Sequence, residues 1–139
     1  MIHPIVQGYI ANNHFGAMLD LEFFVEDGKI INRMPIDKKH LATPFAAHGG
    51  AVSAFMDATM GICALSQVID DNHVVSTIEM KISFVSPAIS GKKLIGSAQT
   101  IKKGKRIVFI EGQIHDDTGN LIAVGSGTFN SYPAKKMGL

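Results

Sequence analysis

Apolar residues follow two different spacings along this chain of 139 residues. The longest apolar stretch, from Gly49 to Val68, contains no proline and is rich in alanine, leucine and methionine, so it predicts one helix about 30 Å long. Shorter runs rich in β-branched residues, bounded by turn-forming residues, predict strands. These strands are expected at 19–25, 29–36, 73–85, 93–101, 106–114 and 121–129, with a short helix at 3–12 and a loop at 37–47.

The order of these elements predicts the fold class. Two strands precede the long helix and four follow it, and the short turns between consecutive strands favour an antiparallel sheet. A helix this apolar needs a sheet face to bury it, which gives an α+β fold with an antiparallel β-sheet wrapped around one long central α-helix. We expect one domain over residues 1–139, with a helical or irregular segment at 1–15 and a short tail at 130–139.

One carboxylate stands in the middle of the long apolar stretch. Asp57 has apolar neighbours on both sides, and burying an unpaired aspartate is energetically costly. One interpretation is a structural aspartate that accepts a hydrogen bond from the backbone or from a nearby hydroxyl, such as that of Ser53 or Thr59. The other is a catalytic carboxylate that acts in general acid–base chemistry.

The start of the predicted helix supplies a second chemical feature. The amides of Gly49 and Gly50 would be among the first helical N–H groups, which have no acceptor within the helix and carry the positive end of its dipole. Asp57 follows about 12 Å further along the axis and roughly 80° around it. One helix therefore does not direct both groups at one carbonyl, whereas two antiparallel copies would. If the two features work together, the sequence predicts a two-fold dimer with two sites at its interface.

Composition disfavours several other functions. A net charge of +1 and a pI of about 7.9 are unlike those of an electrostatic nucleic-acid binder. The single cysteine, Cys63, leaves no intramolecular disulfide, and the N-terminus lacks the pattern of a signal peptide, so we expect a cytoplasmic protein. The apolar stretch approaches the length of a membrane span, but its central Asp57 and the strands that follow favour a buried helix. The histidines are scattered, without metal-ligand spacing.

Four sequence features together resemble a known family. They are His48-Gly49-Gly50, Asp57 in the helix that follows, the strand end Phe84-Val85-Ser86-Pro87-Ala88, and the turn Gly104-Lys105-Arg106. With the order of elements, they resemble the hotdog-fold acyl-CoA thioesterases of the phenylacetate-pathway (PaaI-like) type, over about residues 14–129. The resemblance implies a hotdog domain, dimeric or a dimer of dimers, that hydrolyses acyl-CoA thioesters at the subunit interface without a cofactor.

The resemblance also implies roles for individual residues. The Gly49 amide would polarise the thioester carbonyl, with Gly50 beside it. Asp57 of the facing subunit would act as general base on water or as nucleophile. His48 would orient or bond near the carbonyl, and Thr77, in the strand after the helix, would help to position the water.

Two further groups of residues would contact the substrate. Phe84, with the apolar residues Phe45, Phe55 and Met56, is expected to line part of an acyl tunnel. The basic turn at 102–106 is either a solvated hairpin tip or a grip on the phosphates of coenzyme A. Its candidate contacts are Lys103, Lys105 and Arg106.

One departure from the family pattern keeps a second function open. Relatives often have an asparagine six residues before the histidine, where this chain has Ala42, and His40 is the candidate replacement. The alternative function is therefore a non-catalytic acyl-CoA- or lipid-binding hotdog module. Asp57 opposes this alternative, because a tunnel for an apolar chain has no use for a buried carboxylate.

Overall fold

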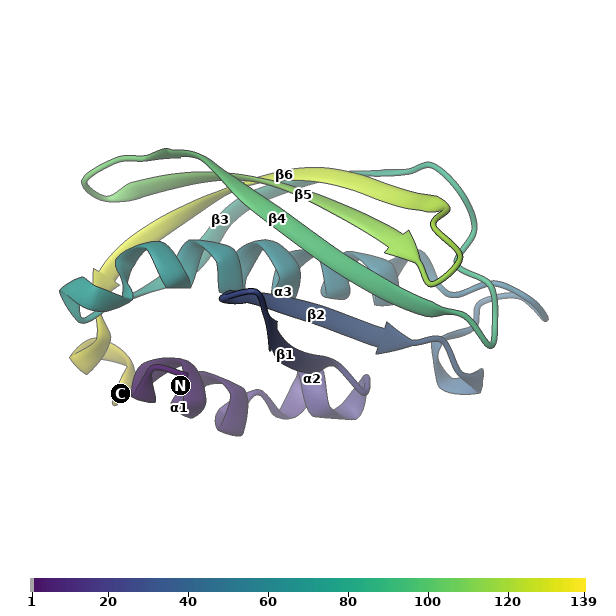
Figure 1. Cartoon of the computed structure of the whole chain (residues 1–139), viewed down its shortest axis with the longest axis horizontal. Coiled ribbons are helices and arrows are strands. Elements are labelled where there is room, and N and C mark those ends of the chain that lie inside the picture. The colour runs from purple at the N-terminus through teal and green to yellow at the C-terminus, as the bar shows by residue number, and fades with distance from the viewer. Residues whose placement is uncertain (1) are drawn as a thin grey trace.

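The computed structural model describes residues 2–139, and Figure 1 shows their arrangement. Residue 1, which the single-domain prediction includes, lies outside the described residues. The elements in chain order are α1 (Pro4–Asn12), α2 (His14–Met18), β1 (Glu22–Glu26), β2 (Lys29–Pro35), the 3-10 turn η1 (Lys38–His40), the long helix α3 (Gly49–Val68), η2 (Ile69–Asp71), β3 (His73–Phe84), β4 (Lys93–Lys103), β5 (Ile107–Asp116), β6 (Leu121–Pro133) and η3 (Ala134–Met137).

A single antiparallel sheet curves around α3. Its strand order is β1-β2-β4-β5-β6-β3, so β1 and β3 are the edge strands. In Figure 1 the strands β3 to β6 lie on one side of α3, and α1 and α2 lie on the other. The core forms where Phe55, Met56 and Met60 of α3 pack with sheet residues such as Ile110 and Phe129. The predicted fold class, an antiparallel sheet around one central helix, is confirmed.

Two glycines in the middle of the sheet allow α3 to lie close to it. A Cβ atom on Gly112 of β5 would stand 2.7 Å from the sulfur of Met56. A Cβ atom on Gly125 of β6 would stand 2.9 Å from the carbonyl oxygen of Lys81 and 3.1 Å from Cγ of Met56. A side chain at Gly125 would meet fixed backbone, and a side chain at either position would meet Met56, so the two glycines leave room for this methionine between helix and sheet. The helix is therefore held against the sheet at Met56, the residue before Asp57.

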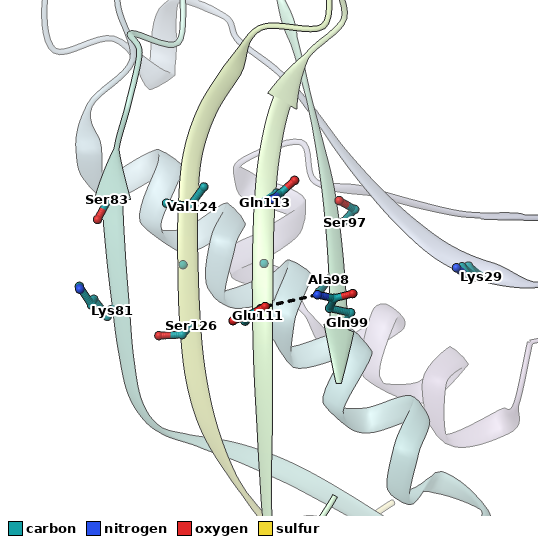
Figure 2. A pocket seen from close by; sticks show the side chains of 12 residues that line it. Lys29, Lys81, Ser83, Ser97, Ala98, Gln99, Glu111, Gln113, Val124 and Ser126 are labelled. Carbon is teal, nitrogen blue, oxygen red and sulfur yellow. Dashed lines mark hydrogen bonds between the residues drawn. The ribbon is translucent and has the colours of Figure 1, made fainter. Parts of the chain in front are cut away.

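The middle of the outer face of the sheet is polar. Figure 2 shows a groove on this face, about 530 Å³ in volume, whose side chains come mainly from β3 to β6. Gln99 Nε2 donates a hydrogen bond to Glu111 Oε2 across it at 3.3 Å. Polar residues outside and apolar residues inside are typical of an antiparallel sheet with one face in water. A substrate with an apolar part is therefore better matched to the helix side of the sheet.

The ends of the chain are more ordered than the sequence predicts. The pattern does not predict α2, because Gly16 reads as a stop signal, whereas Asn13 caps this helix by accepting a hydrogen bond from the Gly16 amide at 3.0 Å. The last strand continues to Pro133, because its final residues pair with the start of β3. Residues 130–139, the predicted short tail, form the end of β6 and η3. Figure 1 shows α1 beside the C-terminal end of the chain.

The segment Gly49–Asp71, α3 with η2, is long and apolar enough to cross a membrane by length and composition alone. Most of it is buried inside the protein, and ten residues of α3 are fully covered. This burial is typical of the core helix of a folded domain, as the sequence pattern predicts.

Candidate active site

The first turn of α3 leaves one backbone donor free. His48 is the N-cap, and its Nδ1 accepts a hydrogen bond from the Gly50 amide at 2.7 Å. The amides of Ala51 and Val52 donate to the His48 carbonyl oxygen at 3.0 and 3.3 Å. No acceptor for the Gly49 amide is found among residues 2–139. The Gly49 N–H, at the positive end of the helix dipole, is therefore the amide available to a ligand.

The loop before α3 is built around a buried histidine. His40 Nδ1 accepts a hydrogen bond from the Asp37 amide at 2.9 Å, so Nε2 carries the proton and donates to the Leu19 carbonyl oxygen at 2.8 Å. Its own carbonyl oxygen accepts from the His48 amide at 2.6 Å. Both ring nitrogens are thus hydrogen-bonded to the backbone. The prediction that the His40 side chain takes the part of the asparagine that relatives have at the position of Ala42 is therefore wrong. His40 instead holds the loop that carries His48.

Phe84 lies next to the free amide. A Cβ atom on Gly49 would stand 3.4 Å from Cζ of the Phe84 ring, so the ring covers the glycine at the distance of an ordinary contact. Phe84 is 54% exposed at the end of β3. Both residues line a surface hollow of about 320 Å³ at the N-terminus of α3. The other residues predicted to line the acyl tunnel lie in different environments. Phe45 is exposed, while Phe55 and Met56 are fully buried in the core.

Asp57 lies on the side of α3 that faces β3, and it has a partner. Thr77 Oγ1 donates a hydrogen bond to Asp57 Oδ1 at 2.7 Å. Asp57 is half-buried rather than enclosed, and its partner is a hydroxyl from the neighbouring strand. Neither local hydroxyl serves it: Thr59 donates to the Phe55 carbonyl oxygen at 2.8 Å, and no bond between Ser53 and Asp57 is found in residues 2–139.

A break in β3 gives Thr77 its position. The pairing of β3 with β6 shifts between Thr77 and Glu79, which leaves Ile78 as the extra residue of a bulge. Bulges re-aim side chains and occur often beside active sites. The bulge separates Thr77, which faces Asp57, from Glu79, which faces Thr128 of β6.

A pocket of about 120 Å³ opens directly beside Asp57. Tyr9 of α1 lies at its edge, and the sequence reasoning missed this residue because no local pattern joins α1 to the middle of α3. Burial raises the pKa of the Tyr9 hydroxyl, and the negative charge of Asp57 raises it further. The phenol therefore stays protonated at neutral pH and remains a hydrogen-bond donor.

The single chain brings together two pairs of predicted residues but not all four. Thr77 meets Asp57, and Phe84 meets Gly49, because β3 runs antiparallel to α3 along its side. The two pairs remain about 12 Å apart along the helix axis. The edge of β3 beyond them has no partner strand among residues 2–139, and Ile78 is 54% exposed there.

The basic turn lies at the far end of the molecule. Lys103 forms an ion pair with Asp71 of η2, with 3.3 Å between Nζ and Oδ2. Lys105 and Arg106 are exposed at the tip between β4 and β5. Asp71 is about 20 Å along the helix axis from Asp57. A ligand that contacts both Asp57 and the basic turn would therefore have to be long and extended.

The remaining reactive side chains do not add a second centre. Burial raises the pKa of the Cys63 thiol, although a hydrogen bond with Thr100 lowers it in part, so the reactive thiolate is disfavoured. Within residues 2–139, no group of three or more histidine, cysteine, aspartate or glutamate side chains is placed to hold a metal ion.

One long central helix wrapped by an antiparallel sheet is the architecture of the hotdog fold, and here it carries a free amide at the helix start and a carboxylate about two turns later. The family model of the thioesterase superfamily matches residues 46–123, more than half of the chain. The chain therefore belongs to the thioesterase superfamily and is a thioester hydrolase.

Curated relatives are similar to this chain in sequence, and solved structures share its fold. The chain is 28% identical over 102 residues to acyl-coenzyme A thioesterase 13 of Homo sapiens, covering 73% of this chain and 71% of the relative. It is 27% identical over 105 residues to a putative esterase of Saccharolobus solfataricus, covering 76% and 73%. The E. coli PaaI protein superposes with a TM-score of 0.82 at 18% identity, covering 91% and 90%. A Bacillus halodurans protein solved with CoA superposes with a TM-score of 0.76 at 26% identity, covering 92% and 85%.

Proposed function

We propose that this protein hydrolyses an acyl-CoA thioester to the free acid and coenzyme A. The hydrogen bond from Thr77 to Asp57 is the observation that carries the proposal. It holds the Asp57 carboxylate in one orientation, in a domain whose family acts on thioesters. The relatives named as acyl-coenzyme A thioesterases and the CoA-bound neighbour support CoA as the thiol part of the substrate. No dissociable cofactor is required for this reaction.

The chemical step uses the two features of α3. The Gly49 N–H donates a hydrogen bond to the thioester oxygen and stabilises the negative charge that develops there. Asp57 acts as general base, taking a proton from water while the water oxygen attacks the carbonyl carbon, or as the nucleophile itself. Thr77 occupies Oδ1, which leaves Oδ2 for this proton. On the general-base route the C–S bond then breaks, and the proton passes from Asp57 to the departing CoA thiolate. On the nucleophile route the C–S bond breaks as Asp57 bonds to the carbonyl carbon. Water then hydrolyses this mixed anhydride, which releases the acid, regenerates the Asp57 carboxylate and supplies the proton for the thiolate.

The site needs a second copy of the chain. Asp57 and Gly49 lie about 12 Å apart along one helix, so two antiparallel copies of α3 across a two-fold axis would place each Asp57 opposite the partner's Gly49. The unpaired β3 edge supports this arrangement, because Thr77 marks the position of Asp57 along it and Phe84 marks that of Gly49. Antiparallel pairing of two β3 edges, with Thr77 near the partner's Phe84, would bring the two halves of the site together. We propose a homodimer, alone or within a tetramer.

Two variants that each disable one half of the site test this proposal. Asp57→Asn removes the base, with an expected loss of about 100-fold or more in kcat. Gly49→Pro removes the free N–H and adds a ring beside Phe84. The backbone accepts it, because proline is favoured at the first helical position and His48 has φ −61° and ψ 138°, the extended conformation that a following proline requires. Its expected loss is about 100- to 1000-fold in kcat. Gly49→Ala keeps the N–H and is the matched control.

Co-expression of the two variants with different tags locates the site. A mixed dimer holds one site with both defects and one intact site, so a site shared across the interface restores about half of the wild-type kcat. A site within one subunit restores nothing. Tight acyl-CoA binding without turnover by the wild-type protein would instead select the alternative, a non-catalytic acyl-CoA- or lipid-binding module.

We also propose a cytoplasmic location for this hydrolase. A single, half-buried cysteine suits a reducing compartment, and the substrate contains coenzyme A under the proposed function. Fractionation of cells expressing the tagged protein tests the location directly.

A further inference from the structure

The pocket beside Asp57 lies on the side of the carboxylate away from Gly49. Its walls are mainly apolar and come from Tyr9, Gly61, Leu65, Tyr132, Met137 and Leu139. We propose that this pocket binds the acyl group, which rests on the thioesterase function above, and that α1 and the C-terminal segment close it so that only a short chain or a single aromatic ring fits.

The position of the pocket follows from the helix. Gly61 is one turn after Asp57, so both residues lie on the same face of α3, and Leu65 continues that face by another turn. In a thioester whose carbonyl carbon lies at Asp57, the CoA part and the acyl group extend in different directions. The acyl group is the apolar part, and it matches the apolar walls of this pocket. The absence of a side chain at Gly61 opens the entrance, since a Cβ atom there would meet only the Phe129 ring, at 3.8 Å.

The far end of the pocket is closed by the two ends of the chain. The Ala134 amide donates to the Asn72 carbonyl oxygen at 2.9 Å and ties η3 to the residue that follows η2. The Leu139 amide donates to the Ala134 carbonyl oxygen at 3.4 Å, and a Cβ atom on Gly8 would stand 3.3 Å from Leu139 Cδ2. Figure 1 shows α1 and the C-terminus together beside the C-terminal half of α3. The C-terminal segment from η3 to Leu139 is therefore packed against both α1 and α3.

The volume of the pocket sets the size of the acyl group. It measures about 120 Å³. An apolar cavity of about 150 Å³ holds one benzene molecule, so this pocket takes about one ring or a straight chain of roughly five or six carbons. Longer fatty-acyl chains would have to displace Met137 and Leu139.

Chain-length preference in turnover is the first test. We expect kcat/KM to be highest for hexanoyl-CoA in a series from acetyl- to hexadecanoyl-CoA. Gly61→Leu fills the entrance and should lower the ratio of hexanoyl- to acetyl-CoA efficiency by about tenfold or more. Gly61→Ala should lower it less, and it keeps the helix intact because alanine favours helix over glycine. The double variant Met137→Ala, Leu139→Ala should raise the efficiency of decanoyl-CoA, whereas Met18→Ala, at an exposed position outside the pocket, should not.

Binding of the product acid is a second test that needs no catalysis. The chain has two tyrosines and no tryptophan, and both tyrosines, Tyr9 and Tyr132, line the pocket. Hexanoate should therefore change the tyrosine fluorescence in a saturable way, acetate should not, and Gly61→Leu should abolish the response to hexanoate.

The outcomes separate the pocket from the activity. Equal kcat/KM for hexanoyl- and hexadecanoyl-CoA would overturn the acyl pocket but not the hydrolase activity. The same conclusion follows if Gly61→Leu loses activity equally for every substrate and still responds to hexanoate like the wild type. Saturable binding of hexanoate by a wild-type protein that hydrolyses no acyl-CoA overturns the thioesterase function on which the assignment depends.

Discussion

Replacement of Thr77 by valine removes a single hydrogen bond from the proposed base. Valine has nearly the shape of threonine and favours strands, so β3 should keep its backbone. The lost bond is 2.7 Å long and ends on a carboxylate, and hydrogen bonds to charged groups contribute about 1.5–3 kcal/mol. If that contribution acts in the transition state, kcat should fall by about 10- to 150-fold, at about 1.4 kcal/mol for each factor of ten.

Steady-state hydrolysis of hexanoyl-CoA, followed by release of the free thiol, measures this effect. We expect the loss in kcat with KM changed by less than about threefold, because the hydroxyl contacts Asp57 rather than the bulk of the substrate. Thr77→Ser keeps the hydroxyl and should recover most of the activity. Thr128→Val is the matched control, since Thr128 Oγ1 donates at 2.6 Å to another carboxylate, that of Glu79.

The result that refutes this reasoning is specific. If Thr77→Val keeps the wild-type kcat while Asp57→Asn loses it, the hydrogen bond has no catalytic part and Thr77 is a strand residue only. If Thr128→Val loses as much activity as Thr77→Val, the effect comes from a general weakening of the β3–β6 pair.

Two more predictions concern acid stability and coenzyme A. Burial alone would raise the pKa of Asp116, but hydrogen bonds from Thr118 and Asn120 outweigh it and hold the pKa at about 2. Because this pKa is depressed relative to the unfolded chain, the carboxylate stabilises the fold above about pH 4, and this stabilisation is lost as the pH falls from about 4 to 2. Asp116→Ala should therefore have a lower Tm at pH 7, with a smaller gap to the wild type at pH 2. If Lys105 and Arg106 bind the CoA phosphates, changing both to glutamine should raise KM for acyl-CoA several-fold at low salt and leave KM for an acyl-N-acetylcysteamine thioester unchanged.

The fold could be predicted from the sequence because its signals are local. The helix Gly49–Val68 has the predicted bounds, since an unbroken apolar run ends at a pair of aspartates and an asparagine that adopts a left-handed conformation, with φ 56° at Asn72. The strands after it begin and end at turn residues within a few positions of the prediction. The ends of the chain were less predictable, because the order of residues 130–139 depends on pairing with β3 and packing on α1.

The site could be predicted only in part, because its contacts join distant segments. Family resemblance pointed to Thr77, and the hydrogen bond to Asp57 fits that role. Residue type alone could not reveal that both ring nitrogens of His40 are hydrogen-bonded to the backbone, since their partners are an amide and a carbonyl that almost any residue supplies. Tyr9 carried no signal at all, because its position beside Asp57 depends on how α1 packs under α3.

If two β3 edges pair in the proposed dimer, the activity of this enzyme depends on its own concentration. A strand of 12 residues with unpaired backbone groups and an exposed Ile78 is a template on which any extended chain can add. Charged Glu79 and Lys81 on the same edge discourage a foreign strand, but they do not remove the donors and acceptors. Under the proposed assembly, dilution would both dismantle the active site and uncover an aggregation-prone surface. Loss of activity and loss of solubility should therefore begin at the same protein concentration.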